Sequence, residues 1–132
     1  MRIFFDTNVL ISAYTARGLG ADLLRLVLSE HELLTGEVNL KAFREVLERR
    51  FAVPAAEVIA AVRELRDHTI IPKPESEPDV EIRDADDLWV YASALAGQAD
   101  VLVTGDRDLL DIAGHVPLRI LTPRRCWQWL RG

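Results

Sequence analysis

The sequence has few residues that could cross-link the chain or hold it in a membrane. Among 132 residues there is one cysteine, so no internal disulfide can form, and no Cys or His pair has the spacing of a zinc site. No apolar run approaches the roughly 18–20 residues that span a bilayer, and the N-terminal segment has no signal-peptide pattern. We therefore expect a cytoplasmic protein without membrane contact.

Positive charge is also in short supply. Lysine and arginine total 16 against 21 acidic residues, which gives a net charge of −5 and excludes a uniformly basic surface that coats nucleic acid. Hydrophobic residues make up 49% of the chain, enough for one core. No linker or internal repeat divides the sequence, so we predict a single domain over residues 1–132.

Hydrophobic patterning predicts strands that alternate with helices. Short apolar runs favour buried strands at residues 3–5, 32–36, 69–71, 101–103 and 118–123. Helical spacing or capping favours helices at residues 9–16, 21–30, 37–51, 55–68, 86–97 and 124–130. The segment 86–97 is apolar almost all round, so Trp89 and Tyr91 are expected in the core. Such alternation predicts an α/β fold, a three-layer α/β/α sandwich with a central parallel sheet.

Aspartates follow two of the predicted strands. Asp6 ends the first apolar run, and Asp106 comes shortly after residues 101–103. Asp86 and Asp87 stand at the start of a helix, from which they can face the same edge of the sheet. Each of these acids has an ordinary alternative role, because aspartates also cap helices, complement helix dipoles and form turns. What favours a site is that the carboxyl ends of parallel strands share one edge.

A gathering of aspartates would need positive charge nearby. Two carboxylates about 4 Å apart repel by roughly 4 kcal/mol at an effective dielectric near 20. Arginines could compensate this repulsion, but oxygen ligands around a concave site are what Mg²⁺ or Mn²⁺ prefers. One or two such ions can activate water and stabilise the departing oxygen in phosphodiester hydrolysis, which would leave 5′-phosphate and 3′-hydroxyl ends.

Three segments carry a resemblance to a known family. The runs FFDTNVLISA (4–13), RDADDLWVYASALA (83–96) and VLVTGDRDLL (101–110) resemble, in order and spacing, the three aspartate motifs of PIN-domain ribonucleases. The similarity is greatest to small single-domain VapC-type toxins. It implies a PIN-like α/β/α fold, endonucleolytic cleavage of RNA with Mg²⁺ or Mn²⁺, a cognate antitoxin protein as partner and a homodimer.

The resemblance also implies roles for individual residues. Asp6 matches the first metal-binding aspartate, Asp87 the one at the helix start, and Asp106 the one in the T-x-D motif. Thr104 is then the hydroxyl partner of Asp106, and Asp108 is a further acid on that side. These three matched aspartates are predicted to be both the catalytic and the metal-binding residues.

A fourth acid of the family has no direct counterpart. The family glutamate would fall on Ala42, and Glu45 lies one helical turn further on, from where it can reach the same region. Glu45 is therefore the predicted fourth catalytic and metal-binding residue, although with Lys41 at i−4 it also fits a solvated helix face. Asn8 and Thr104 are expected to orient carboxylates, and Asp86 to support them.

Other classes of protein remain as alternatives. A dehalogenase-like phosphatase requires a D-x-D motif at the end of the first strand, but Asn8 stands where the second aspartate of that motif would be. A response-regulator receiver requires a lysine after its fifth strand, and the segment ILTPRR has none. A catalytically weak or silent PIN-like module that binds a protein is a third possibility, which the alanine at position 42 favours.

Overall fold

The computed structural model describes residues 1–132, in which strands and helices alternate. The strands are β1 (Arg2–Phe5), β2 (Glu32–Gly36), β3 (Thr69–Ile71), β4 (Val101–Val103) and β5 (Arg119–Leu121). The helices are α1 (Thr7–Thr15), α2 (Leu19–Glu30), α3 (Glu37–Arg49), α4 (Ala55–Arg66), α5 (Ala85–Ala96), α6 (Arg107–Asp111) and α7 (Pro123–Arg131), with a 3₁₀ turn at Ala113–His115. The elements agree closely with those expected from the patterning.

All five strands pair in parallel, in the order β3-β2-β1-β4-β5. From β1 the chain adds β2 and β3 on one side and then crosses to place β4 and β5 on the other. The strand order therefore reverses between β1 and β4, and open parallel sheets bind ligands at such a point, beyond the carboxyl ends of the strands. Asp6 leaves β1 there, and its amide donates a 3.0 Å hydrogen bond to the carbonyl of Val103.

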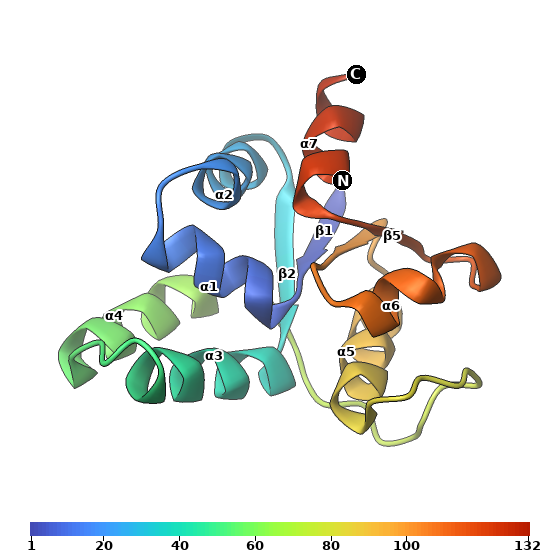
Figure 1. Ribbon diagram of the computed structural model, residues 1–132, viewed down its shortest axis with the longest axis horizontal. Helices are drawn as coiled ribbons and strands as arrows, with labels where there is room; N and C mark the ends of the chain where they lie inside the picture. The colour runs from blue at the N-terminus through green and yellow to red at the C-terminus, as the bar shows by residue number, and fades with distance from the viewer.

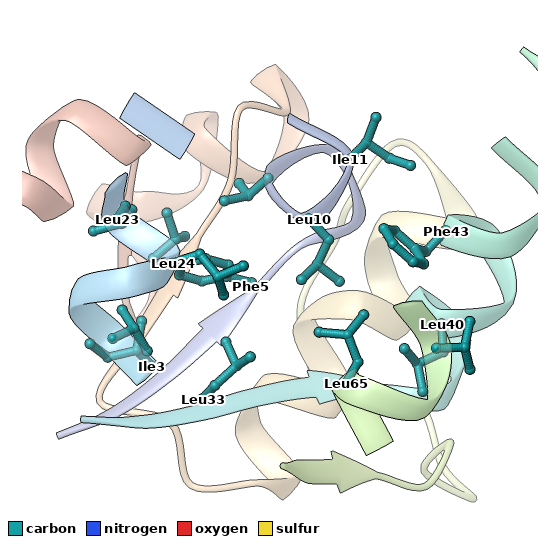
Figure 2. Packing of buried hydrophobic residues seen from close by; sticks show 14 of the residues in the cluster. Ile3, Phe5, Leu10, Ile11, Leu23, Leu24, Leu33, Leu40, Phe43 and Leu65 are labelled. Carbon is teal, nitrogen blue, oxygen red and sulfur yellow. The ribbon is translucent and has the colours of Figure 1, made fainter. Parts of the chain in front are cut away.

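Helices cover both faces of this sheet (Figure 1). Helices α1, α2, α3, α4 and α7 pack on one face, and α5 and α6 on the other. Side chains of a strand alternate between faces, so Ile3 and Phe5 join the larger core while Phe4 joins the core beneath α5. Figure 2 shows Ile3 and Phe5 among the apolar side chains of that larger core, which include Leu10 and Phe43. The predicted three-layer α/β/α architecture is confirmed.

Two details differ from the sequence-based expectations. The short helix α6 was not predicted, because five residues are too few for a helical period to show. Trp89 is half-buried rather than a core residue, whereas Tyr91 is buried as predicted. The reason is that α5 buries Val90, Tyr91 and Ala94 against the sheet, which leaves Trp89 on its flank. No helix has the length and apolar character needed to cross a membrane.

Candidate metal centre

Asp6 is the most tightly held carboxylate at the sheet edge. It caps the N-terminus of α1 and is only 4% exposed. Its Oδ1 accepts from the Thr7 amide at 2.7 Å, and its Oδ2 accepts from the Thr104 hydroxyl at 2.6 Å and from Asn8 Nδ2 at 3.2 Å. Burial raises the pKa of Asp6, and these hydrogen bonds oppose the shift.

Asn39 is a further partner of Asp6 that sequence reasoning missed. This fully buried residue of α3 donates from Nδ2 to Asp6 Oδ1 at 3.1 Å and to the Thr7 hydroxyl at 3.0 Å, and its Oδ1 accepts from the Gly36 amide at 3.3 Å. A signal was present in the sequence: Asn39 lies four residues before Phe43, so a polar side chain occupies the apolar face of that helix. A buried amide in such a place needs polar partners.

The T-x-D segment is joined to Asp6 through Thr104. The buried Thr104 hydroxyl donates to the Asp6 carboxylate and accepts from the Asp106 amide at 3.0 Å. Thr104 was predicted as the hydroxyl partner of Asp106; its hydroxyl does bond the Asp106 amide, and the carboxylate to which it donates is that of Asp6. Asn8 Nδ2 donates to Asp6, and its Oδ1 also accepts from the Gly105 amide at 2.9 Å. These bonds hold the loops after β1 and β4 against each other.

Three other aspartates bring their oxygens together beside this network. Carboxylate oxygens of Asp87, Asp106 and Asp108 all lie within 4.8 Å of one another. Asp106 caps α6, where its Oδ1 accepts from the Asp108 amide at 2.8 Å. Asp108 was expected only as a supporting acid, yet it stands in this group, which we call the aspartate cluster.

Asp87 has the least favourable surroundings of the aspartate cluster. Its side chain is 8% exposed, and its Oδ2 is buried without any hydrogen-bond partner. Burial, a hydrogen bond to Asp106 and the charges of Asp106, Asp84 and Asp6 raise the pKa of Asp87 to about 8. The metal-free protein therefore favours a protonated Asp87.

The aspartate cluster fits a divalent cation. An unpartnered buried oxygen costs free energy, and a cation that binds it removes that cost together with the repulsion between the carboxylates. The available donors are carboxylate oxygens, with no sulfur or imidazole among them, which suits Mg²⁺ or Mn²⁺ rather than zinc. Asp6 contributes a fourth nearby carboxylate, whose orientation its protein donors fix.

A cleft of about 660 Å³ opens between α3 and α5 over part of this group of acids, and Asp108 lies outside its lining. Asp6, Asp87 and Asp106 all line it, so the three matched aspartates share one neighbourhood as predicted. Ala42 and Glu45 line the wall formed by α3, so Glu45 faces the cleft but stands outside the aspartate cluster. Asp86 lines the opposite wall and is exposed, with its amide bonded to the α5 cap Asp84 at 2.8 Å.

Comparison with known proteins identifies the family. The fold and site define an α/β protein with an acidic centre at the reversal point of a parallel sheet. The family model described as the PIN domain matches residues 2–108. The chain therefore belongs to the PIN domain family, a family of nucleases that use divalent metals. No curated protein matches the chain.

Solved structures with this fold include several toxin–antitoxin proteins. VapBC2 from Rickettsia felis, bound to a DNA fragment from the promoter, is 16% identical with a TM-score of 0.63, over 92% of this chain and 97% of that one. VapBC-1 from nontypeable Haemophilus influenzae is 17% identical with a TM-score of 0.63, over 94% of this chain and 99% of that one. Mycobacterium tuberculosis VapC20, a sarcin–ricin loop cleaving toxin, is 18% identical with a TM-score of 0.60, over 89% of this chain and 98% of that one.

Proposed function

We propose that this protein is a Mg²⁺- or Mn²⁺-dependent endoribonuclease that hydrolyses RNA phosphodiester bonds and acts as the toxin of a toxin–antitoxin pair. The observation that carries the proposal is the unpartnered buried oxygen of Asp87 beside two further aspartates. A structural acid cluster would be expected to have arginine partners, but only one basic side chain lies within ion-pair distance of the cluster: Arg83, whose Nε is 4.0 Å from Asp108. A divalent metal ion, which takes carboxylate oxygens as ligands, would satisfy such an oxygen.

The acids of the site share the task of holding metal in the proposed reaction. Asp87 and Asp106, with Asp6 and Asp108 beside them, would hold one or two ions, which supply Lewis acidity and lower the pKa of water. Glu45 would complete the site from the α3 wall, in place of the glutamate that position 42 lacks. Thr104, Asn8 and Asn39 hold Asp6 in a fixed orientation, so little reorganisation is needed when charge develops at the phosphorus.

The proposed partners follow from the similar structures. Two of them are described as VapBC, and we propose a cognate antitoxin protein for this chain as well. We further propose that the active form is a homodimer and that it works in the cytoplasm, where its RNA substrate is found. Size-exclusion chromatography with light scattering, for the purified chain alone, measures the mass that would show or refute the dimer.

The direct test is cleavage of RNA by the purified chain. We expect Mn²⁺- and Mg²⁺-dependent internal cuts with 5′-phosphate and 3′-hydroxyl ends, and Asp87→Asn or Asp106→Asn should lower the rate at least 100-fold. Asp67→Asn, at an exposed position after α4, is the matched control and should cleave normally. If RNA stays intact with either metal, and Asp6→Asn leaves metal affinity unchanged, the nuclease proposal is wrong.

A second candidate is a PIN-like module that binds a protein and has little or no activity. It is favoured by Ala42 and by the position of Glu45 outside the aspartate cluster. Calorimetric titration with Mn²⁺ separates the two. A nuclease should bind Mn²⁺ with micromolar to low-millimolar affinity, and Asp87→Asn should abolish that binding. A silent module should show no Mn²⁺ binding that depends on Asp87.

A further inference from the structure

The walls of the cleft carry cations that no carboxylate neutralises. Both lysines of the chain, Lys41 and Lys73, line it, together with Arg50. None of these three forms an ion pair, although other basic residues such as Arg2 and Arg66 do. In a chain of net charge −5, free positive charge is therefore placed directly beside the acids. Cations in this position attract a ligand with several negative charges.

Two aromatic side chains accompany these cations, one on each wall. The Lys73 ammonium lies 4.6 Å from the centroid of the Trp89 ring, and Trp89 is only two residues from Asp87 on α5. On the other wall Phe51 follows Arg50 directly, just beyond the end of α3, and is 48% exposed. Because α5 packs on the sheet with other residues, the core does not require an aromatic ring at position 89.

An aromatic ring next to a cation suits one nucleotide of an unpaired strand. The ring offers a face on which a base stacks, and the cation pairs with the adjoining phosphate. Lys73 is exposed, and a lysine side chain has a long stem with rotatable bonds, so its ammonium can leave the Trp89 ring for that phosphate when a base arrives. A duplex cannot use such a ring, because its bases are already stacked and paired.

We propose that Trp89 with Lys73, and Phe51 with Arg50, form two nucleotide subsites that select unpaired RNA for the aspartate cluster. The inference rests on the proposed ribonuclease function and extends it to the substrate's conformation and to the residues that recognise it. The Trp89–Lys73 subsite would bind the nucleotide nearer Asp87, and the Phe51–Arg50 subsite would extend the contact along α3.

The proposal is tested by the binding of a fluorescein-labelled RNA that has no self-complementarity. Binding is measured by fluorescence anisotropy in the presence of Mg²⁺, and every variant also carries Asp106→Asn to prevent cleavage. Trp89→Leu should raise the Kd about 10-fold, within the roughly 5- to 150-fold that stacking energies imply, and Trp89→Phe should restore most of the affinity. Lys73→Gln should lower the slope of log K against log salt by about 0.7, as loss of one phosphate contact requires. The same sequence annealed to its complement should bind at least 10-fold more weakly.

Controls separate this inference from the proposed function. Arg63→Gln removes an exposed charge on α4 outside the cleft and should change neither Kd nor salt slope. If unmutated protein cleaves RNA but Trp89→Leu, folded by circular dichroism, binds and discriminates normally, the subsites are wrong while the nuclease stands. If unmutated protein cleaves no RNA, the proposed function fails. Equal loss in Trp89→Leu and Trp89→Phe, or equal affinity for duplex, would also overturn the subsites.

Discussion

Asp87 shows most clearly, at the scale of single residues, how the site is built at the expense of stability. The fold buries its carboxyl group beside Asp106 and leaves one oxygen unpartnered, which no requirement of packing explains. Strain of this kind is characteristic of functional positions, where the cost is recovered when a ligand binds.

Asp87→Asn is therefore expected to stabilise the metal-free protein and to prevent metal from stabilising it. At pH 7.5 the free energy of unfolding should rise by about 1–3 kcal/mol, because folding no longer has to neutralise a carboxylate. Urea denaturation with and without 5 mM Mn²⁺, which is about the upper end of the affinity range proposed, measures both effects. A destabilised variant that still gains stability from Mn²⁺ would contradict this description of Asp87, and Asp67→Asn is the matched control.

Asn39 is expected to matter for stability as much as a core residue does. Asn39→Ala removes two donated hydrogen bonds and one accepted hydrogen bond to partners that are buried or half-buried, so the free energy of unfolding should fall by about 2–4 kcal/mol. Chemical denaturation measures this loss. Ser29→Ala, which removes a single exposed hydroxyl bond, should cost less than about 0.5 kcal/mol. Similar values for the two variants would show that the buried network contributes little.

At the scale of elements, close approach between β2 and α5 fixes the cleft. Gly36 ends β2 with Ser93 of α5 directly above it, so a β-carbon there would lie 3.1 Å from the Ser93 hydroxyl and 2.8 Å from Asn39 Oδ1. Both distances are shorter than ordinary contact. A larger residue at position 36 would push α5, and Asp87 with it, away from the sheet.

Gly36→Ala should accordingly reduce stability by about 1–3 kcal/mol and lower the cleavage rate through displacement of Asp87. Thermal unfolding and RNA cleavage assays would measure these effects. Gly114→Ala is the matched control, because nothing lies within 4 Å of a β-carbon at that position. The prediction fails if both alanines have the same effect.

Sequence patterning could predict most elements because the strands are short apolar runs with clear ends. Val101–Val103, for example, follows a charged residue, stops at Thr104 and is buried on both faces of the sheet. Trp89 was misplaced because an apolar helix gives no indication of which flank meets the sheet. Asn39 was missed because its partner Asp6 is 33 residues away, and only the folded sheet edge joins them.

At the scale of the whole molecule, aspartates from distant segments are gathered by the reversal of strand order. Asp6 and Asp106 are 100 residues apart in sequence but follow adjacent strands. Because the strands that precede them could be recognised in the sequence, the matched aspartates could be predicted to lie at one edge of the sheet. The inclusion of Asp108 in the aspartate cluster depends instead on the short helix α6, which the sequence did not reveal. The position of Glu45 outside the cluster likewise follows from the placement of α3.

Global stability should therefore depend on pH in a direction set by the cluster. Raised pKa values for Asp87 and Asp6 mean that the metal-free folded protein binds more protons than the unfolded chain, so stability falls as pH rises from about 5 to 8. Glu32 and Glu37, whose pKa values hydrogen bonds lower, act in the opposite direction but only below about pH 4.5. Melting temperatures at pH 5, 6.5 and 8 test this trend, and saturating Mg²⁺ should reverse it, because deprotonated ligands bind metal better. If the melting temperature of the metal-free protein instead rises from pH 5 to 8, the raised pKa values given for Asp87 and Asp6 are wrong.

A crystal structure of the protein with Mn²⁺, with the ion located by its anomalous signal, tests most directly whether the aspartate cluster is a metal centre. We predict at least one ion in the cleft with oxygens of Asp87 and Asp106 as ligands, and with Asp6 or Asp108 in the same coordination sphere. A crystal saturated with Mn²⁺ that shows no ion at these carboxylates, or shows the cluster neutralised by basic side chains, would contradict the account.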